Sequence, residues 1–371
     1  MTFGPMYHEC DNQTPGRPIP RWMQTRRLRI WERVMSAYRR VVLASRPVGA
    51  PTLDNFRLET GPMPAPANGQ LLVRTLYLSL DPYMRGRMSI APSYARPVAI
   101  GDAMEGEVVA EVVESRAAGY RPGDLVRAMV GWRTHAAIDP EDARRVQAAP
   151  VPITTYLGVL GMPGFAAYVG MKLIGQPRHG ETLLVAAATG PVGSLAGQLA
   201  KLAGAHAIGI AGGTDKCRYL VTTLGFDAAV DRHAEDFARA LQEQCPEGVD
   251  IYFENVGGEI WHAVLPLLNR YARVPVCGLA ALYNGVQQSG RDWWPDTSLA
   301  VLRRSLLIRG FLNSEFVVEH YSAFLGEIAP LVASGRIRYR EHIVAGLEAA
   351  PRAFIGMLEG RNFGKSLVKV G

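Results

Sequence analysis

The sequence predicts an α/β protein with two domains, one built on a doubly wound parallel sheet and one on a partly open β-barrel. Three observations support this prediction. Residues 182–210 read as a strand, a turn of small residues, a helix and a second strand. Many short strands separated by Pro and Gly turns precede this unit. At 371 residues, the chain is also too long for one simple core.

Composition places the chain among globular proteins with many turns. Hydrophobic residues make up 48% of it, and it contains 39 glycines and 25 prolines. The formal net charge is +6 at pH 7, and residues 1–34 alone hold six arginines and three acidic residues. Elsewhere cations are mixed with acids, which argues against a nucleic-acid partner. There is no apolar run of about 18 residues, so we expect no membrane span.

The cysteines and the start of the chain indicate a cytoplasmic protein. The four cysteines are Cys10, Cys217, Cys245 and Cys277, and none forms a Cys-x-x-Cys pair. Neither a disulfide framework nor a structural zinc cluster is therefore indicated. No apolar signal core lies near the N-terminus, and a reducing compartment is the default for such a chain.

Residues 1–34 differ from the rest of the chain and have two interpretations. Residues 15–20 (PGRPIP) cannot hold regular structure, whereas residues 25–40 could form a basic amphipathic helix. The segment could be a surface-binding arm. We favour a disordered or non-native leader, with Met35 as the true start, because the segment cannot bury enough apolar surface to fold alone.

The β-barrel domain is predicted over residues 35–165 and 314–371. Strands are expected at residues 40–43, 56–59, 70–77, 106–114, 120–127 (after a turn), 343–344 and 365–370. A helix is expected over residues 319–334, ahead of the two returning strands.

The parallel-sheet domain is predicted over residues 166–313. Residues 157–175 have helical spacing and lead into it. Its strands are expected at residues 182–187, 206–210, 249–253, 273–279 and 307–312.

The turn after the first of these strands predicts a dinucleotide site. In a strand–turn–helix unit, glycines let the backbone approach a pyrophosphate, and the helix N-terminus directs free N–H groups at its charge. Ala188 replaces the first glycine of the pattern, while Gly190 and Gly193 remain. This frame favours a Rossmann-type cofactor site over an ordinary glycine turn.

The next strand favours NADP over NAD. An acid at its end usually holds the ribose hydroxyls of NAD, but here residues 211–213 are Ala-Gly-Gly. Lys216 follows, and Arg232 could add a second cation for the 2′-phosphate. The alternative is that Asp215 binds the ribose while Lys216 is a solvated surface charge. We predict NADPH as the cofactor.

Six long segments resemble one enzyme family. They are LYLSLDPYMRGRMS (76–89), LGVLGMPGFAAY (157–168), AAATGPVGSLAGQLAK (186–201), IYFENVGG (251–258), VPVCGLAALYN (274–284) and NFGKSLVKV (362–370). The chain from about residue 40 onward is similar to the zinc-independent medium-chain dehydrogenase/reductases, above all to the curcumin reductases of bacteria. Prostaglandin reductases and leukotriene hydroxydehydrogenases are more distant. The resemblance implies a Rossmann domain and a GroES-like barrel that carries catalytic residues.

The resemblance also implies which residues contact the cofactor. They lie in the glycine turn, at the two cations, beside the nicotinamide and near the C-terminus: Thr189, Gly190, Val192, Gly193, Lys216, Arg232, Asn255, Cys277, Gly278, Tyr283, Phe311, Leu312 and Asn362. Arg232 stands where relatives often carry a tyrosine. The family's TAY element reads Ala166-Ala167-Tyr168 here, so its threonine is missing.

The residues also argue against a zinc site. Zinc-dependent relatives carry a Gly-His-Glu element, but residues 101–106 (GDAMEG) hold no histidine, and no cysteine lies between Cys10 and Cys217. Without a metal to polarise a carbonyl, an α,β-unsaturated carbonyl can itself accept the electrons of a hydride. The resemblance therefore implies NADPH-dependent reduction of the carbon–carbon double bond of enones and dienones of the curcumin type.

Two tyrosines are candidates for the catalytic role. A hydroxyl that hydrogen-bonds the enolate oxygen would stabilise the transition state by about 3 kcal/mol. Tyr283, aided by the cofactor's ribose hydroxyl, is the first choice and Tyr83 the second, although either could be merely a packed ring. Trp293 and Trp294 could cover an apolar or aromatic substrate, or serve a dimer contact or loop packing. Cys277 reads as a small strand-end residue rather than a nucleophile.

Two other functions stay open at this point. One is an NADPH-dependent quinone reductase of the same fold, which assays with an enone and a quinone would separate. The other is a non-catalytic NADPH-binding protein, including one that binds RNA, and the mixed charges count against RNA binding. A homodimer is expected in either enzyme case.

Overall fold

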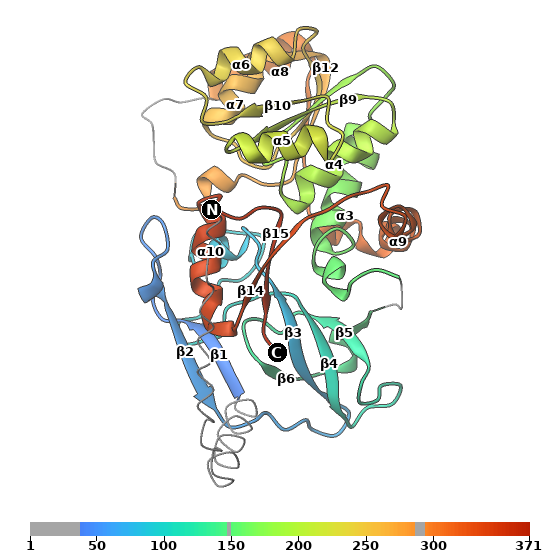
Figure 1. Cartoon of the computed structure of the whole chain (residues 1–371). Coiled ribbons are helices and arrows are strands. Elements are labelled where there is room, and N and C mark those ends of the chain that lie inside the picture. The colour runs from blue at the N-terminus through green and yellow to red at the C-terminus, as the bar shows by residue number, and fades with distance from the viewer. Residues whose placement is uncertain (1–37, 147–149, 286–293) are drawn as a thin grey trace, which may run out of the picture.

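The computed structural model describes residues 38–146, 150–285 and 294–371. Figure 1 shows two main sheets, with the helix-flanked sheet above and the other below, and with helix α3 (Met162–Val169) near their junction. The leader of residues 1–34 lies outside the described residues. The prediction that a basic helix extends to Arg40 is wrong for its last residues, because strand β1 spans Tyr38–Leu43.

Six strands form the upper, parallel sheet in the order β10-β9-β8-β11-β12-β13. They are β8 (Thr182–Val185), β9 (His206–Ala211), β10 (Ala228–Asp231), β11 (Val249–Phe253), β12 (Leu268–Val276) and β13 (Leu307–Gly310). The predicted doubly wound sheet is confirmed. After β8 the chain continues to β9 and β10 on one side of the sheet, and after β11 it continues to β12 and β13 on the other side. The loops that follow β8 and β11 therefore diverge and open a crevice at the carboxyl ends of these two strands.

Helices lie against this sheet, and α4 explains why the predicted unit folds. They are α4 (Pro191–Leu202), α5 (Thr214–Thr222), α6 (Phe237–Gln244), α7 (Glu259–Val264) and α8 (Trp294–Arg304). Pro191 suits the first helical position because its missing N–H has no partner there. Leu195 and Leu199 are buried on the sheet side, and Gly204 ends the turn in the left-handed conformation, with φ 79°.

The lower sheet has seven strands and is largely antiparallel. Its path is β14-β15-β3-β4-β5-β7, with β6 also pairing with β3, and β1 and β2 form a separate hairpin. The strands are β2 (Phe56–Gly61), β3 (Leu71–Ser79), β4 (Val108–Ser115), β5 (Leu125–Ala128), β6 (His135–Ile138), β7 (Arg144–Arg145), β14 (Glu341–Ala345) and β15 (Lys365–Lys369). Because β15 pairs with β3, the C-terminal strands complete a sheet begun near the N-terminus.

An aromatic cluster joins the C-terminal helix to this second sheet. The rings of Phe56 and Trp132 stack at 5.6 Å, and Phe354 on α10 (Ala350–Leu358) meets both edge-on. Such pairs each add about 0.5–1.5 kcal/mol beyond the area that they bury. This packing holds the segment that leads from α10 to β15, which contributes to the site described below.

Residues 157–175 are not the single helix that was expected. A 3₁₀ turn over Ile153–Leu157 comes first, then α3, then a π-helical turn over Gly170–Gly175. The backbone packs tightly on the preceding turn at the start of α3, where a Cβ on Gly161 or Gly164 would collide with backbone atoms, so these two positions require glycine. The long helix α9 spans Val317–Ala333, within two residues of its expected bounds.

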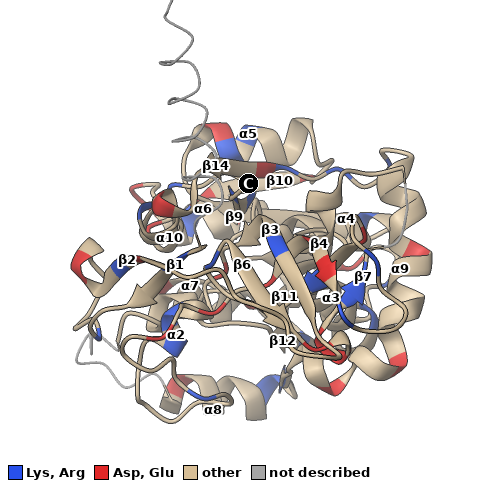
Figure 2. Ribbon diagram, turned by 90° about the horizontal axis from the view of Figure 1, so that it is seen from below, with Lys and Arg blue, Asp and Glu red and all other residues tan. Residues whose placement is uncertain are grey.

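The surface carries mixed charges. Blue and red segments alternate over the face shown in Figure 2, where helix α2 (Met84–Arg87) lies between the labels of β1 and α8. None of the helices in the described ranges is both long and apolar enough to cross a membrane.

Candidate active site

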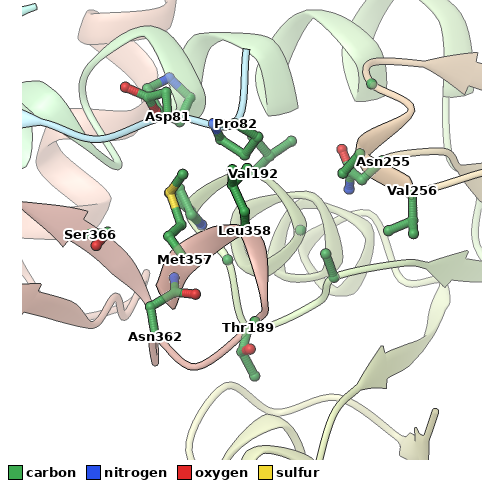
Figure 3. Close-up of a pocket in the computed structure, with 18 of the residues that line it drawn as sticks. Asp81, Pro82, Thr189, Val192, Asn255, Val256, Met357, Leu358, Asn362 and Ser366 are labelled. Atoms are coloured by element: carbon green, nitrogen blue, oxygen red, sulfur yellow. The ribbon is translucent and has the colours of Figure 1, made fainter. Parts of the chain in front are cut away.

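A pocket of about 390 Å³ opens at the carboxyl ends of the parallel strands, where the strand order reverses. Figure 3 shows that its walls come from distant parts of the chain. Asp81 and Pro82 lie on one side, Asn255 and Val256 on another, and Asn362 on the C-terminal segment. Both halves of the chain therefore contribute to the pocket.

The glycine turn forms one wall of the pocket, and its packing explains why Ala188 can replace the first glycine of the usual pattern. Ala188 is fully buried, and a Cβ on Gly209 of β9 would stand only 2.8 Å from the Ala188 Cβ. The neighbouring strand thus makes room for the methyl group that replaces the first glycine. Gly193 cannot be replaced in this way, because its Cβ would lie 2.7 Å from the Ala187 carbonyl oxygen.

The predicted cations meet at another wall of the pocket. The Lys216 ammonium donates a hydrogen bond of 2.7 Å to the Gly360 carbonyl. Burial and, secondly, the charge of Arg232 lower the pKa of Lys216. Gly212 lacks the Cβ that would stand 2.9 Å from the Arg232 Nε, so the end of β9 makes room for that guanidinium. Two cations beside one cavity favour an anionic group there.

The acid considered as an alternative does not reach the pocket. Asp215 is 83% exposed, and its carboxylate accepts a 3.0 Å hydrogen bond from Arg218. It is not among the residues that line the pocket. Asp231, at the end of β10, accepts hydrogen bonds from the backbone of Gly213 and His233, so it shapes the loop near the cations.

Glu254 organises the turn after β11 and was missed by sequence reasoning. Its buried carboxylate accepts hydrogen bonds from Val256 N at 2.7 Å, Gly257 N at 2.8 Å and the Tyr252 hydroxyl at 3.1 Å. Burial raises its pKa. The only signal in the sequence was an acid directly before Asn255. The Asn255 amide donates to the Ala186 carbonyl at 2.9 Å, which ties the ends of β11 and β8 together.

The segment after β12 brings Tyr283 to the pocket. The backbone N–H groups of Cys277 and Gly278 both donate to the Glu254 carbonyl. The Tyr283 hydroxyl is 3.1 Å from the point where a Cβ on Gly278 would stand, so the missing side chain lets the hydroxyl pack closely against this backbone. Burial raises the pKa of Tyr283, with the Leu279 backbone opposing the shift. Burial also raises the pKa of the Cys277 thiol to about 12, which disfavours a nucleophilic thiolate.

Tyr83 lines the opposite wall with Asp81 and Pro82. Its hydroxyl contacts the Met129 sulfur at 4.0 Å, and the Arg87 guanidinium lies over its ring at 5.5 Å. Burial raises its pKa, and the Asp81 charge adds to the shift. The structure therefore brings both candidate tyrosines to one pocket as protonated hydroxyls.

A buried ion pair supports that wall, and sequence reasoning had quoted both of its residues without giving them a role. The Lys365 ammonium lies 2.6 Å from an Asp81 carboxylate oxygen and donates to the Leu80 carbonyl at 2.8 Å. Their side chains are only 3% and 6% exposed. The Ser79 hydroxyl hydrogen-bonds the other Asp81 oxygen.

Taken together, most of the predicted site residues line the pocket. Its lining includes Thr189, Gly190, Val192, Gly193, Lys216, Arg232, Asn255, Cys277, Gly278, Tyr283, Tyr83 and Asn362. Phe311 and Leu312 are not among the lining residues. Phe311 is buried beside Gly170, and Leu312 is 38% exposed.

Two other expectations concern the loop and metal binding. Trp293 lies outside the described residues, and Trp294 begins α8 with 71% of its surface exposed. No three His, Cys, Asp or Glu side chains within the described ranges lie close enough together to hold a metal ion.

Comparisons with known proteins agree on one family. Residues 39–146 match the family described as the N-terminal domain of oxidoreductase, and residues 191–326 match the zinc-binding dehydrogenase family. The chain is 50% identical to the NADPH-dependent curcumin reductase of Escherichia coli (strain K12), over 90% of this chain and 96% of that one. It is 39% identical to the NADP(+)-dependent 2-alkenal reductase of Nicotiana tabacum, over 82% and 88% of the two chains.

A solved structure is similar over the same range. The crystal structure of CurA from Vibrio vulnificus in complex with NADPH superposes with a TM-score of 0.87 at 49% identity. The match covers 90% of this chain and 99% of that one.

Proposed function

Since this chain belongs to the medium-chain dehydrogenase/reductase family, in the group of NADPH-dependent reductases, we propose that it reduces the carbon–carbon double bond of α,β-unsaturated ketones. It is an NADPH-dependent oxidoreductase, similar to relatives named for curcumin and 2-alkenal reduction. One observation carries the proposal: two half-buried tyrosines line the same pocket as the glycine turn and the two cations.

The pocket fits NADPH by the chemistry of its walls. The turn at Gly193 has no room for a Cβ, so its backbone is available to a pyrophosphate. Helix α4 begins at Pro191 and directs its first N–H groups toward that turn. Lys216 and Arg232 would hold the 2′-phosphate, and Asn255, Gly278 and Asn362 would border the rest of the cofactor.

The tyrosine hydroxyl stabilises the charge that forms on the substrate. NADPH, when bound, supplies a hydride to the β-carbon. Negative charge then develops on the carbonyl oxygen, and Tyr283 donates a hydrogen bond to that oxygen. A tyrosine hydroxyl is protonated at neutral pH, and burial raises the pKa of Tyr283 further, so the hydroxyl is available as a donor. The enolate takes a proton at the α-carbon, which completes the saturated ketone.

The pocket walls favour a small apolar or aromatic substrate. Met162, Pro163, Ala166 and Val256 contribute apolar surface beside the tyrosines. Dienones of the curcumin type and alkenals meet this description. Steady-state NADPH oxidation with enones, dienones, quinones and plain ketones tests the substrate class. Higher kcat/KM with quinones than with enones would contradict the proposal.

Tyr283→Phe tests the catalytic role directly. The change removes one donor and keeps the ring, so kcat should fall about 10- to 1,000-fold while the KM for NADPH stays near wild type. Tyr83→Phe is the matched control, because Tyr83 lines the same pocket from the other half of the chain. If Tyr83→Phe alone abolishes turnover, the role belongs to Tyr83. Weaker NADPH binding with normal turnover in Tyr283→Phe would mean that the ring only packs on the cofactor.

We also propose a homodimer. Strand β13 forms an edge of the parallel sheet, and all of its side chains are exposed, with Leu307 at 51%. An open apolar edge is suited to pairing with a second copy. Light scattering coupled to size-exclusion chromatography should give twice the monomer mass, and a monomer at micromolar concentration would refute this.

A further inference from the structure

A buried arginine next to the first pocket wall makes an unusual set of contacts. Arg85 lies on α2, two residues after Tyr83, and is 4% exposed. Its Nε donates to the Asn284 side-chain oxygen at 3.2 Å, and its Nη2 donates to the Gly49 carbonyl at 2.6 Å. Both acceptors are neutral. A guanidinium held in the interior without a carboxylate is costly, which calls for a reason beyond packing.

Asn284 directly follows Tyr283, so this contact reaches the segment that carries the proposed catalytic hydroxyl. The start of that segment is held by the sheet: Ala280 N donates to the Asn255 carbonyl and Ala281 N to the Val256 carbonyl. Beyond Tyr283, the contact with Arg85 holds the segment from the other half of the chain. Tyr283 therefore lies in sequence between two anchored points: Ala280 and Ala281 are held by the turn after β11, and Asn284 is held by Arg85 on α2.

The guanidinium is well suited to this role. Its planar fork donates in fixed directions: the bond to the Gly49 carbonyl fixes the guanidinium, and the bond from Nε then fixes the Asn284 amide oxygen more tightly than a lysine could. The two residues are 199 positions apart in the sequence, and the contact joins α2 to the segment that follows the turn Ala280–Leu282. A displacement of about 1 Å in a reacting group can lower turnover about 100-fold.

We propose that Arg85 and Asn284 are positioning residues that hold the Tyr283 hydroxyl at the carbonyl oxygen of the substrate. The proposal rests on the enone reductase function above. It differs from a merely structural link between the halves, because it acts on turnover and only through Tyr283. Substitutions of Asn284 carry the test, since Asn284 is half-buried and Arg85 also holds the loop at Gly49.

Asn284→Ala removes the acceptor and should lower kcat about 5- to 50-fold. The KM for NADPH should stay near wild type, because the glycine turn and Lys216 are untouched. The melting temperature should fall modestly, because the buried Arg85 Nε loses its acceptor. Asn284→Asp keeps an oxygen acceptor for Arg85 and should retain most of the turnover. Arg85→Lys loses the fork and should lower kcat at least as much as Asn284→Ala, because the loop at Gly49 loses its donor as well. Asn269→Ala is the matched control, since that amide bonds the Glu247 carbonyl far from the pocket and should keep normal kcat.

The decisive comparison is made in the Tyr283→Phe background. If Asn284 acts through the hydroxyl, adding Asn284→Ala should change kcat less than twofold further. Full turnover in Asn284→Ala, or the same fold-loss with and without the hydroxyl, would overturn the proposal. If Tyr283→Phe has low turnover while Asn284→Ala has normal turnover, only the positioning proposal fails. If Tyr283→Phe itself has normal turnover, the catalytic assignment of Tyr283 fails, and this proposal with it.

Discussion

Replacing Lys216 by alanine should separate the two nicotinamide cofactors. The ammonium stands at the edge of the pocket, beside the Arg232 guanidinium and 2.7 Å from the Gly360 carbonyl. NADPH carries a 2′-phosphate that these cations can bind, whereas NADH carries only a hydroxyl there. The variant should therefore lose affinity for one cofactor and not for the other.

The magnitude follows from one charge-assisted hydrogen bond. Such a bond contributes about 1.5–3 kcal/mol, and each 1.4 kcal/mol is a factor of ten in affinity. Because Arg232 remains and the site is only half-buried, we expect the lower part of this range. The KM for NADPH should rise about 10- to 50-fold, while the KM for NADH changes less than about twofold.

Steady-state kinetics with both cofactors and one saturating enone measures this effect. Arg218→Ala is the matched control, because that cation lies on the same helix but pairs with the exposed Asp215 carboxylate at 3.0 Å. It should leave both KM values unchanged. Equal losses for NADPH and NADH in Lys216→Ala would refute the 2′-phosphate assignment and favour a role of Lys216 in holding Gly360.

Three further predictions concern pH, stability and the start of the chain. Because burial and Arg232 lower the pKa of Lys216, its charge is lost as pH rises through that lowered value. The KM for NADPH should therefore rise at alkaline pH more than the KM for NADH does. A ratio of the two KM values that stays constant with pH would contradict this. Lys365→Met leaves the buried Asp81 carboxylate without its partner and should lower the free energy of unfolding by about 3–5 kcal/mol, measured with denaturant. A second change, Asp81→Leu, should restore part of this loss. An unchanged unfolding midpoint in Lys365→Met would show that the pair does not stabilise the fold. A chain that begins at Met35 should keep the melting temperature and activity of the full chain, since the family match begins at residue 39; insolubility of the shorter chain alone would show a structural role for the leader.

Local patterns predicted much of the parallel-sheet half. The strand expected at residues 249–253 is β11 with the same bounds, and the glycine turn lies where the pattern placed it. These features repeat over short distances in the sequence, with periods that the backbone itself imposes. The alanine at position 188 was also visible in the local pattern. That Gly209 makes room for its methyl group could not be predicted, because this depends on which strands are neighbours.

Long-range contacts are the part that the sequence did not predict. The Lys365–Asp81 pair and the Arg85–Asn284 bond join residues 284 and 199 positions apart, and neither leaves a periodic signal. The cofactor contacts expected at Phe311 and Leu312 came from resemblance alone and stay a prediction; both residues follow β13, which ends at Gly310, and neither is among the residues that line the pocket. The short strands β6 and β7 were missed because two to four residues cannot establish an alternating pattern.

The position of a transferred hydride tests the central claim most directly. NADPH labelled with deuterium at the reactive nicotinamide carbon should be incubated with an enone, and the product analysed by NMR and mass spectrometry. We expect one deuterium on the former β-carbon, one solvent proton on the α-carbon and an intact carbonyl. Deuterium on the carbonyl carbon, in an allylic alcohol that keeps its double bond, would contradict double-bond reduction at this site.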